Sequence, residues 1–551
     1  YLHYLLPGID PNTSSDPGLP EVPVFRTMIA VPPGAIVRLP NVQIEEGQPL
    51  QGLLLPAQPS PADAPMAQSP EDEMPNPKDF MDLPFARDDE AYRSDKPWPP
   101  QPVEVKSMGM VRDLEVWQVS IAGGRYIPAK GEILPYKSMT VEFVFEGGKE
   151  GFLPSGRQEN PFDGNRNPLY EGDGLDGLNP LYGAVINRAV LLQYPYEFPI
   201  VVQPLCWGHE FLIITDPAFR PAADTLRNWK VSKGISTLVV ETGNDPNDAG
   251  TTRIAIKAYI KNRYDTCLTR PSYVLLLGDA EQIPPFYRTT TYGDSAGTDL
   301  DYSLMSGADI LPDLAYGRIP VDTLAQANTV INKIVAYEDN PPFNADFYDT
   351  ATVASYFQCC RPDVVNDGTD SRSFLETSEL IRSHLLGQGY EVERIYDTNT
   401  SYHNDPSEAS YYNSTTRSTV PNRYYNNALL PADLRASSGY VWDGNSTDVI
   451  NAFNDGRFLI MHRDHGGVNG WGDPGFGTGN IASLNNGALL PVVYSVNCAS
   501  GLWDNETRNP ANDFYTYNTN AGGTYWAESL LRQEDGAIGV IGDTRNSPTW
   551  A

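Results

Sequence analysis

From about residue 205 onward, the chain alternates short apolar runs with segments of helical periodicity. Strands alternating with helices predict a mostly parallel sheet covered by helices on both faces. The expected fold class of this part is therefore α/β, with right-handed crossovers between strands. The expected strands are 211–215, 237–240, 273–279, 350–357, 391–396, 457–462, 491–496 and 537–542, and the expected helices are 218–232, 250–263, 324–338, 372–387, 447–455 and 525–533.

The first 150 residues follow a different pattern. Short β-type runs, such as 24–31, 115–121 and 139–145, are separated by proline and glycine. This pattern predicts an all-β, sandwich-like domain, with a proline-rich, acidic irregular insertion at 54–102. The expected division is a β domain at 1–150, an extended connector at 151–204, and an α/β region whose first and second parts are 205–400 and 401–551.

The net charge restricts the possible partners. The chain has 39 basic and 70 acidic side chains, a formal net charge of −31. Nucleic acid and anionic membrane both require a positive surface, so neither is an expected partner. No apolar run reaches the length of about 18 residues that predicts a membrane span. The start of the chain lacks the features of a signal peptide, so such a segment is expected to be absent or removed.

Two of the apolar runs lead directly into reactive side chains. The run 457–461 is followed by His462, Asp464 and His465-Gly466, and the run 490–496 is followed by Asn497-Cys498. Because the carboxyl ends of parallel strands meet at one edge of a sheet, the imidazole of His465 and the thiol of Cys498 are expected there together. A thiol beside an imidazole favours nucleophilic catalysis. The glycine after His465 leaves backbone N–H groups accessible to an oxyanion.

Other interpretations of these residues remain open at this point. Cys498 could be a buried structural cysteine, and a zinc site of His462, His465 and Cys498 is conceivable, although its spacing matches no zinc motif. An acidic loop holding Asp299, Asp301 and Asp309 could bind calcium or simply be solvated.

The chain has five cysteines, so at least one lies outside any internal disulfide. Adjacent Cys359 and Cys360 are unlikely to bond to each other because neighbouring positions strain the disulfide. Whether Cys206 pairs with Cys267 is left open.

A set of ordered segments resembles the gingipain-type cysteine peptidases, whose caspase-like fold belongs to the clan of caspases and legumains. The N-terminal stretches 31–35 and 126–133 are similar to that family's β-rich propeptide. The segments that carry the resemblance in the α/β region are 229–235, 273–279, 283–285, 298–302, 312–318, His465-Gly466 with Trp471, Cys498, 526–532 and 536–542.

The resemblance implies a secreted, latent endopeptidase that cleaves polypeptides through a thioester acyl-enzyme. Cys498 would be the nucleophile, His465 the general base and acid, and the N–H groups of Gly466 and Cys498 the oxyanion hole. The N-terminal domain would be the inhibitor, released by a cut in the connector, for which Arg188 is a candidate. No organic cofactor is needed for this chemistry, and some family members bind structural calcium.

Two positions depart from the family pattern. Some members place a glutamate behind the histidine, near the end of the strand that here ends Ala354-Ser355-Tyr356-Phe357-Gln358, and no glutamate stands there. Arginine-directed members place an aspartate ahead of the helix at 372–387, where this chain has Phe374 with Asp370 nearby, so arginine specificity is not carried over. The alternative function is a catalytically silent caspase-like module for adhesion or assembly.

Overall fold

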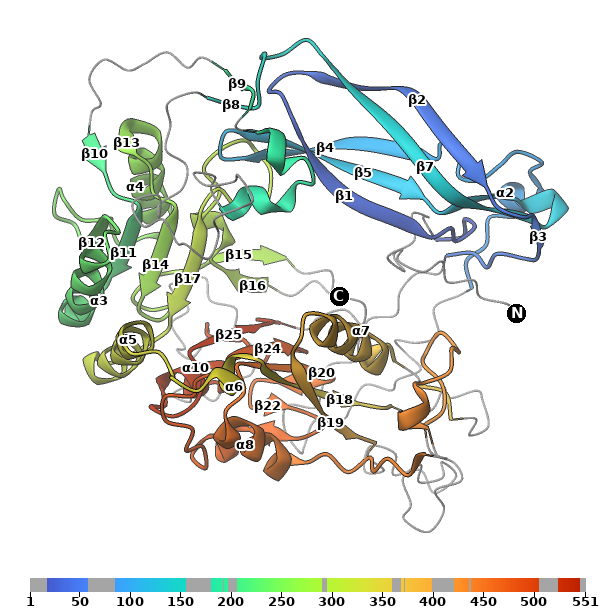
Figure 1. Ribbon diagram of the computed structural model, residues 1–551. Helices are drawn as coiled ribbons and strands as arrows, with labels where there is room; N and C mark the ends of the chain where they lie inside the picture. Colours follow the sequence, from blue (N-terminus) through green and yellow to red (C-terminus); the bar gives the residue numbers. More distant parts are fainter. Residues whose placement is uncertain are drawn as a thin grey trace.

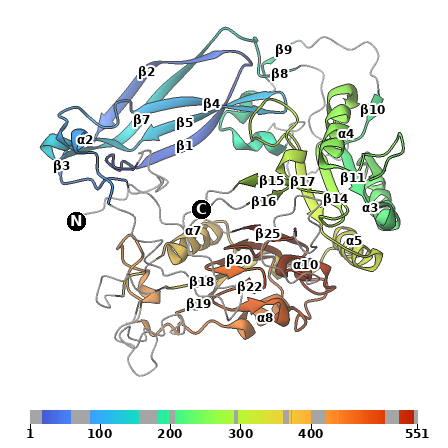
Figure 2. The ribbon, with the colours of Figure 1, turned by 180° about the vertical axis from the view of Figure 1, so that it is seen from behind.

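The computed structural model describes residues 17–57, 85–154, 180–191, 193–196, 206–289, 295–358, 368–370, 372–398, 421–435, 438–504 and 524–545. Cys359 and Cys360 lie outside these residues. Figures 1 and 2 show an N-terminal β domain beside one parallel sheet, with a second parallel sheet below them. Among the described residues, no helix combines the length and hydropathy needed to span a bilayer.

The N-terminal domain is built from two antiparallel sheets, which confirms the predicted sandwich. One sheet has the order β1 (Val24–Val31), β5 (Leu114–Ala122), β4 (Val103–Val111). In the other, β7 pairs with β2, β3 and β6. Buried Val31, Val37 and Val119 belong to one apolar cluster drawn from both sheets. The second sheet consists of β2 (Ile36–Glu46), β3 (Leu50–Gln51), β6 (Gly124–Ile127) and β7 (Glu132–Glu146), and a short helix, α2 (Asp89–Arg93), packs near β6.

The described part of the connector packs on the N-terminal domain rather than running free of it. Two 3-10 turns, η3 (Pro180–Ala184) and η4 (Arg188–Val190), follow one another there. The Asn187 side chain exchanges two hydrogen bonds with the backbone of Ala30 in β1, at 2.8 and 3.0 Å. Strand β8 (Leu153–Pro154) pairs with β9 (Pro195–Tyr196). Tyr182 is fully buried in the same apolar cluster as Ala30, so the described residues 180–191 and 193–196 pack with the β domain.

The first half of the α/β region holds a four-stranded parallel sheet in the order β12-β11-β14-β17. Helices α3 and α5 cover one face, where Leu226 and Val330 pack on Ile213. Helix α4 covers the other face through Ile256 and Ile260. The elements are β11 (Phe211–Thr215), α3 (Arg220–Ser232), β12 (Thr237–Glu241), α4 (Arg253–Thr266), β14 (Tyr273–Leu277), β17 (Ala315–Ile319) and α5 (Leu324–Asp339).

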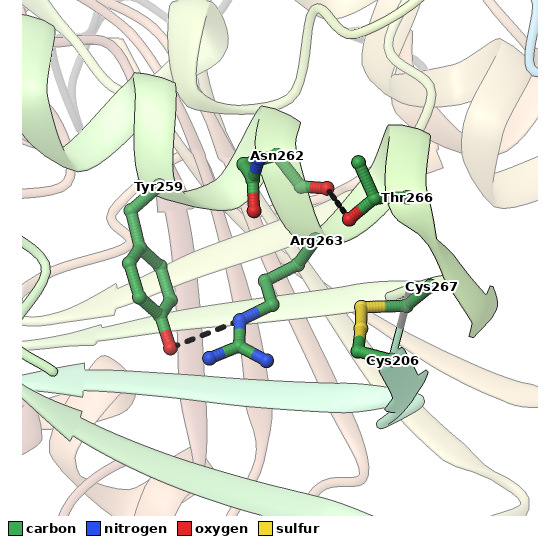
Figure 3. Close-up of a disulfide and its surroundings, with 6 residues drawn as sticks. All are labelled: Cys206, Tyr259, Asn262, Arg263, Thr266 and Cys267. Carbon is green, nitrogen blue, oxygen red and sulfur yellow. Dashed lines mark hydrogen bonds between the residues drawn. A yellow bond between two sulfur atoms is a disulfide. The ribbon is translucent and has the colours of Figure 1, made fainter. Parts of the chain in front are cut away.

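A disulfide fixes the start of this half. Cys206 in β10 (Cys206–Gly208) is bonded to Cys267 in β13 (Cys267–Thr269), and the two short strands run parallel. Figure 3 shows the bridge beside the C-terminal end of α4, where Thr266 bonds to the Asn262 carbonyl. The pairing that the sequence left open is therefore present.

The second half holds a five-stranded parallel sheet in the order β19-β18-β20-β24-β25. Helices α8 and α10 pack on one face, where Phe453 and Trp526 meet Val493. Helix α7 packs on the other face, where Leu375 meets Val353. The elements are β18 (Thr350–Tyr356), α7 (Phe374–Gly387), β19 (Glu391–Asp397), α8 (Ser446–Asp455), β20 (Leu459–Arg463), β24 (Val492–Val496), α10 (Trp526–Arg532) and β25 (Gly539–Gly542).

The α/β fold is thus confirmed, but the strands form two sheets instead of one. The change from one sheet to the other falls between α5 and β18, well before residue 400. Lys333 of α5 joins the halves, because its ammonium donates to the carbonyls of Leu531, Gln533 and Ala537 at 2.7, 2.7 and 3.0 Å.

The tip of the β4–β5 hairpin joins the N-terminal domain to the first half. Arg112, at the tip, is buried; its N–H donates to Asp313 Oδ1 at 2.6 Å and its guanidinium donates to the Pro271 carbonyl at 3.1 Å. Asp113 forms an ion pair of 2.6 Å with Arg270. We call the contacts of Arg112 and Asp113 the hairpin clasp.

Candidate active site

The register of two neighbouring strands brings His465 and Cys498 to the same edge of the second sheet. Strands β20 and β24 run parallel, and Arg463 pairs with Val496 as the last pair between them. His465 and Cys498 each lie two residues beyond that pair. Because paired strands lie about 4.8 Å apart, the two turns that carry these residues leave the sheet side by side.

The two turns are in direct contact. A β-carbon on Gly466 would lie only 2.3 Å from Oδ1 of Asn497, the residue before Cys498. Any side chain at 466 would therefore push the two turns apart. Asn497 Oδ1 has no hydrogen-bond partner among the described residues, while its amide nitrogen lies 2.8 Å from His462 Nδ1 and donates to Ser495 Oγ at 2.9 Å.

The imidazole of His465 is enclosed and has a polar contact with Gln358. Its exposed fraction is 8%. The ring of Phe374, the first residue of α7, meets it edge-to-face with centroids 5.1 Å apart. Burial, together with the positive charges of Arg372 and Arg463, lowers the pKa of His465 to about 3. The ring is therefore a neutral base over the ordinary pH range.

The polar contact of His465 comes from a residue that the sequence pattern did not assign. His465 Nε2 lies 2.9 Å from Oε1 of Gln358. Gln358 follows β18 by two residues, and β18 pairs with β20. It therefore stands at the place where the resemblance noted a missing glutamate. The rule that functional groups gather at the carboxyl ends of parallel strands would have selected it once the strand order was known.

The turn after β24 holds Cys498 in a tight conformation. Cys498 carries a thiol and is 4% exposed. Ala499, the next residue, has a φ of 54°, which is uncommon for a residue other than glycine. The N–H groups of Ala499 and Gly501 donate to the carbonyls of Arg545 and Asp543, each at 2.9 Å. The turn is thus fixed by the chain that follows β25, and the backbone strain lies next to the sulfur.

His462 lies in the interior rather than at the edge. Its ring stacks on Trp471 with centroids 4.4 Å apart. Its Nε2 lies 3.2 Å from the Asp473 carbonyl, and its Nδ1 lies 2.8 Å from the Asn497 amide nitrogen. Burial lowers the pKa of His462 to about 3. Because protein groups occupy both ring nitrogens, His462 does not fit the role of a zinc ligand.

Two buried carboxyl groups surround the histidine turn. Asp464 Oδ2 accepts the Asp473 N–H at 2.6 Å, so Asp464 braces the following loop rather than the imidazole. Asp370 Oδ1 accepts the Arg372 N–H at 3.1 Å. Burial raises the pKa of both carboxyl groups well above its usual range. Among the described residues, no hydrogen bond reaches Asp464 Oδ1 or Asp370 Oδ2.

The three carboxylates expected to bind calcium are each engaged by protein groups. Asp299 accepts two hydrogen bonds of 2.8 Å from Arg318. Asp301 accepts from Arg288 at 2.9 and 3.0 Å. Asp309 accepts the backbone N–H of Met110 in the N-terminal domain at 2.9 Å. With arginine and backbone partners in place, these residues do not fit a shared calcium site.

One cluster with a metal-compatible arrangement does occur in the described part of the chain, formed by Asp279, Glu281 and Asp322. Arg532 occupies it, with Nη1 2.8 Å from Asp322 Oδ2 and Nη2 3.1 Å from Asp279 Oδ2. Arg532 is therefore paired with two of the three carboxylates in this cluster.

Comparisons with known protein families match most of the chain. The model of peptidase family C25 matches residues 208–550, and the C25 propeptide model matches residues 9–167. Lys-gingipain of Porphyromonas gingivalis is 25% identical over 343 residues, which cover 60% of this chain and 17% of the relative. Gingipain R2 of the same organism is 21% identical over 468 residues, 84% of this chain and 51% of the relative. The chain thus spans about half or less of the length of these curated relatives.

Two solved structures align with part of the chain at low identity. The crystal structure of the Arg-specific cysteine proteinase gingipain R aligns with a TM-score of 0.43 and 21% identity, covering 63% of this chain and 65% of that one. The complex of Porphyromonas gingivalis RgpB pro- and mature domains aligns with a TM-score of 0.42 and 22% identity, covering 61% and 64%.

Proposed function

Because this chain belongs to peptidase family C25 and also carries that family's propeptide, we propose that it is a latent cysteine endopeptidase with Cys498 as nucleophile and His465 as general base and acid. The observation that carries the proposal is the register of β20 and β24, which places both residues two positions beyond the same strand pair. The substrates would be proteins and peptides.

The reaction would proceed through a thioester. As the Cys498 sulfur attacks the scissile carbonyl carbon, His465 takes the thiol proton and then gives it to the leaving amine when the C–N bond breaks. Water, deprotonated by the same imidazole, then hydrolyses the thioester and releases the carboxylate and the thiol. The neutral state of His465 suits it to accept the first proton.

The backbone N–H groups of Gly466 and Cys498 are the proposed oxyanion donors. The Gly472 N–H donates to the His465 carbonyl at 2.9 Å, and Gly466 pairs with Trp471 in the adjacent antiparallel step. In an antiparallel ladder, hydrogen-bonded pairs alternate with pairs that are not hydrogen-bonded. The Gly466 N–H therefore turns away from its partner strand, where it can donate to a developing oxyanion.

The N-terminal domain is the proposed inhibitor. The hairpin clasp buries Arg112 against Asp313 and pairs Asp113 with Arg270, so the domain is held by desolvated charge contacts. Arg188, the candidate cleavage point, lies in η4, which docks on β1 through the neighbouring Asn187. Cleavage there would require this short segment to detach first. Secretion fits the Cys206–Cys267 disulfide, since such bonds persist in oxidising compartments.

The test compares the full-length chain with its Cys498→Ala variant on fluorescein-labelled casein. We expect the wild type to gain activity as its connector is cut, and the variant to stay inactive while its circular dichroism is unchanged. N-terminal sequencing of the active species reports the cut, with Arg188 as the first candidate. Casein cleavage by the Cys498→Ala variant would contradict the nucleophile, and a fully active chain with intact residues 1–205 would contradict latency. A wild type that never cleaves casein and never reacts with a peptidyl chloromethyl ketone would instead support the silent module.

A further inference from the structure

The residue that contacts His465 is an amide, and this fact has a chemical consequence. Gln358 Oε1 lies 2.9 Å from His465 Nε2. A glutamine oxygen can only accept, so the contact places the imidazole proton on Nε2 and leaves the lone pair on Nδ1. In this tautomer, Nδ1 is the ring nitrogen that can accept a proton.

The backbone of Gln358 is fixed independently of the histidine. The buried carboxyl group of Asp370 accepts the backbone N–H groups of both Gln358 and Arg372. Gln358 also continues directly from β18, which pairs with β20 along five residues from Ala351 to Ser355. The side chain therefore extends toward His465 from a rigid strand end, as a group that positions another must do.

The surroundings explain why an amide suits this position. Asp370 and Glu376 already place carboxyl groups nearby, and burial raises the pKa of both. A carboxylate at 358 would be desolvated and would favour the charged form of the adjacent His465. An amide accepts the imidazole N–H without adding charge.

We propose that Gln358 is the positioning residue of the catalytic pair: a neutral third member that holds the tautomer and direction of His465 without raising its basicity. This inference rests on the proposed function and adds to it a role for Gln358, a residue outside the Cys498–His465 pair. Because the third member carries no charge, the imidazole stays a weak base, and catalysis is expected to persist into mildly acidic solution.

The experiment measures how fast iodoacetamide alkylates Cys498 between pH 4 and 9, alongside casein cleavage. Each full-length variant is incubated for the time at which the wild type, with its connector cut, cleaves casein. In Gln358→Glu, a carboxylate beside Nε2 should stabilise the imidazolium, so the acid limb of the alkylation profile should move upward by about 1–3 pH units. In Gln358→Ala, kcat for casein should fall about 100-fold, because the His465 ring is no longer held in its orientation. The matched control is Gln326→Glu, since Gln326 caps α5 far from the site.

The outcomes separate the two proposals. A wild type with neither casein cleavage nor alkylation at Cys498 overturns the proposed function. An active wild type, with Gln358→Glu showing the wild-type pH profile and Gln358→Ala the wild-type kcat, overturns only the role of Gln358. A lower melting temperature in Gln358→Ala with unchanged kcat would show that the amide merely satisfies a buried ring nitrogen. That result also counts against the proposal.

Discussion

Charged side chains gather at the carboxyl edge of both parallel sheets, but the two edges differ in how far these charges are paired. At the edge of the first sheet, Arg318 binds Asp299 through two hydrogen bonds of 2.8 Å and also donates to the carbonyls of Gly278 and Ile283. At the edge of the second sheet, Asp464 and Asp370 each keep an oxygen that accepts no hydrogen bond from the described residues.

The difference separates a structural edge from a reactive one. Paired and desolvated charges hold the first edge in one arrangement, and breaking such a pair is costly. Buried carboxyls that each leave one oxygen without a hydrogen bond from the described residues, a neutral imidazole and the strained Ala499 at the second edge are features that the fold must support from elsewhere. Such features concentrate at functional sites.

The largest expected effect comes from breaking the pair at the first edge. Replacing Arg318 by methionine leaves the Asp299 carboxylate buried without its partner, and we expect a loss of about 3–5 kcal/mol in the free energy of unfolding. Urea denaturation followed by fluorescence measures it. The control is Arg457→Met, whose partner Glu393 is more exposed and whose loss should cost less than about 1 kcal/mol. Equal losses in the two variants would remove the distinction.

An intermediate effect should depend on pH at the second edge. Burial, with the nearby charge of Asp473, raises the pKa of Asp397, the last residue of β19, to about 7. Between about pH 4 and 7 the folded chain holds a proton that the unfolded chain releases, so this group's contribution is full below about pH 4 and is lost as the pH rises through 7.

The Asp397→Asn variant should remove that loss. Its stability relative to the wild type should rise from pH 5 to 7, by at most about 1.4 kcal/mol per pH unit, and level off above pH 7. Chemical denaturation at four pH values tests this. The control is Asp265→Asn, which changes a carboxylate on α4 paired with Lys261. A difference that stays constant with pH would contradict the assignment.

The smallest expected effect concerns the strained residue beside the sulfur. Ala499 has a φ of 54°, where glycine is favoured, so Ala499→Gly should stabilise the fold by about 0.5–1 kcal/mol. The control is Ala482→Gly, at a position with a φ of −63°, where the same change should destabilise by a similar amount. Melting temperatures of both variants give the comparison, and the same sign in both would argue against strain at Ala499.

Much of the fold could be predicted because buried strands carry uninterrupted apolar runs. The expected limits of β11 and α5 lie within one residue of those observed. The division into two sheets could not be predicted, because strand order depends on packing between distant segments. The packing of Tyr182 on the β domain could not be predicted either, because it also joins segments that are distant in the sequence.

At the candidate site, the placement of His465 and Cys498 at one edge followed from the strand pattern and is confirmed as a placement. Their catalytic roles remain a prediction. The calcium expectation for Asp299 stays a prediction, and composition alone could not show that the carboxylate has a protein partner. Arg318 lies 19 residues further along the chain, so nothing in the local pattern shows that it neutralises Asp299.

The Cys206–Cys267 bridge has a consequence for the cleaved form. Cys206 is the first residue described after the connector, and its bond reaches 61 residues along the chain. A cut upstream of Cys206 would leave the new amino-terminal segment covalently attached to β13 through this bond. Aminopeptidases that trim the new amino terminus would stop at this cross-link. The resistance of the cleaved form to such trimming would therefore depend on whether the surroundings keep the disulfide oxidised.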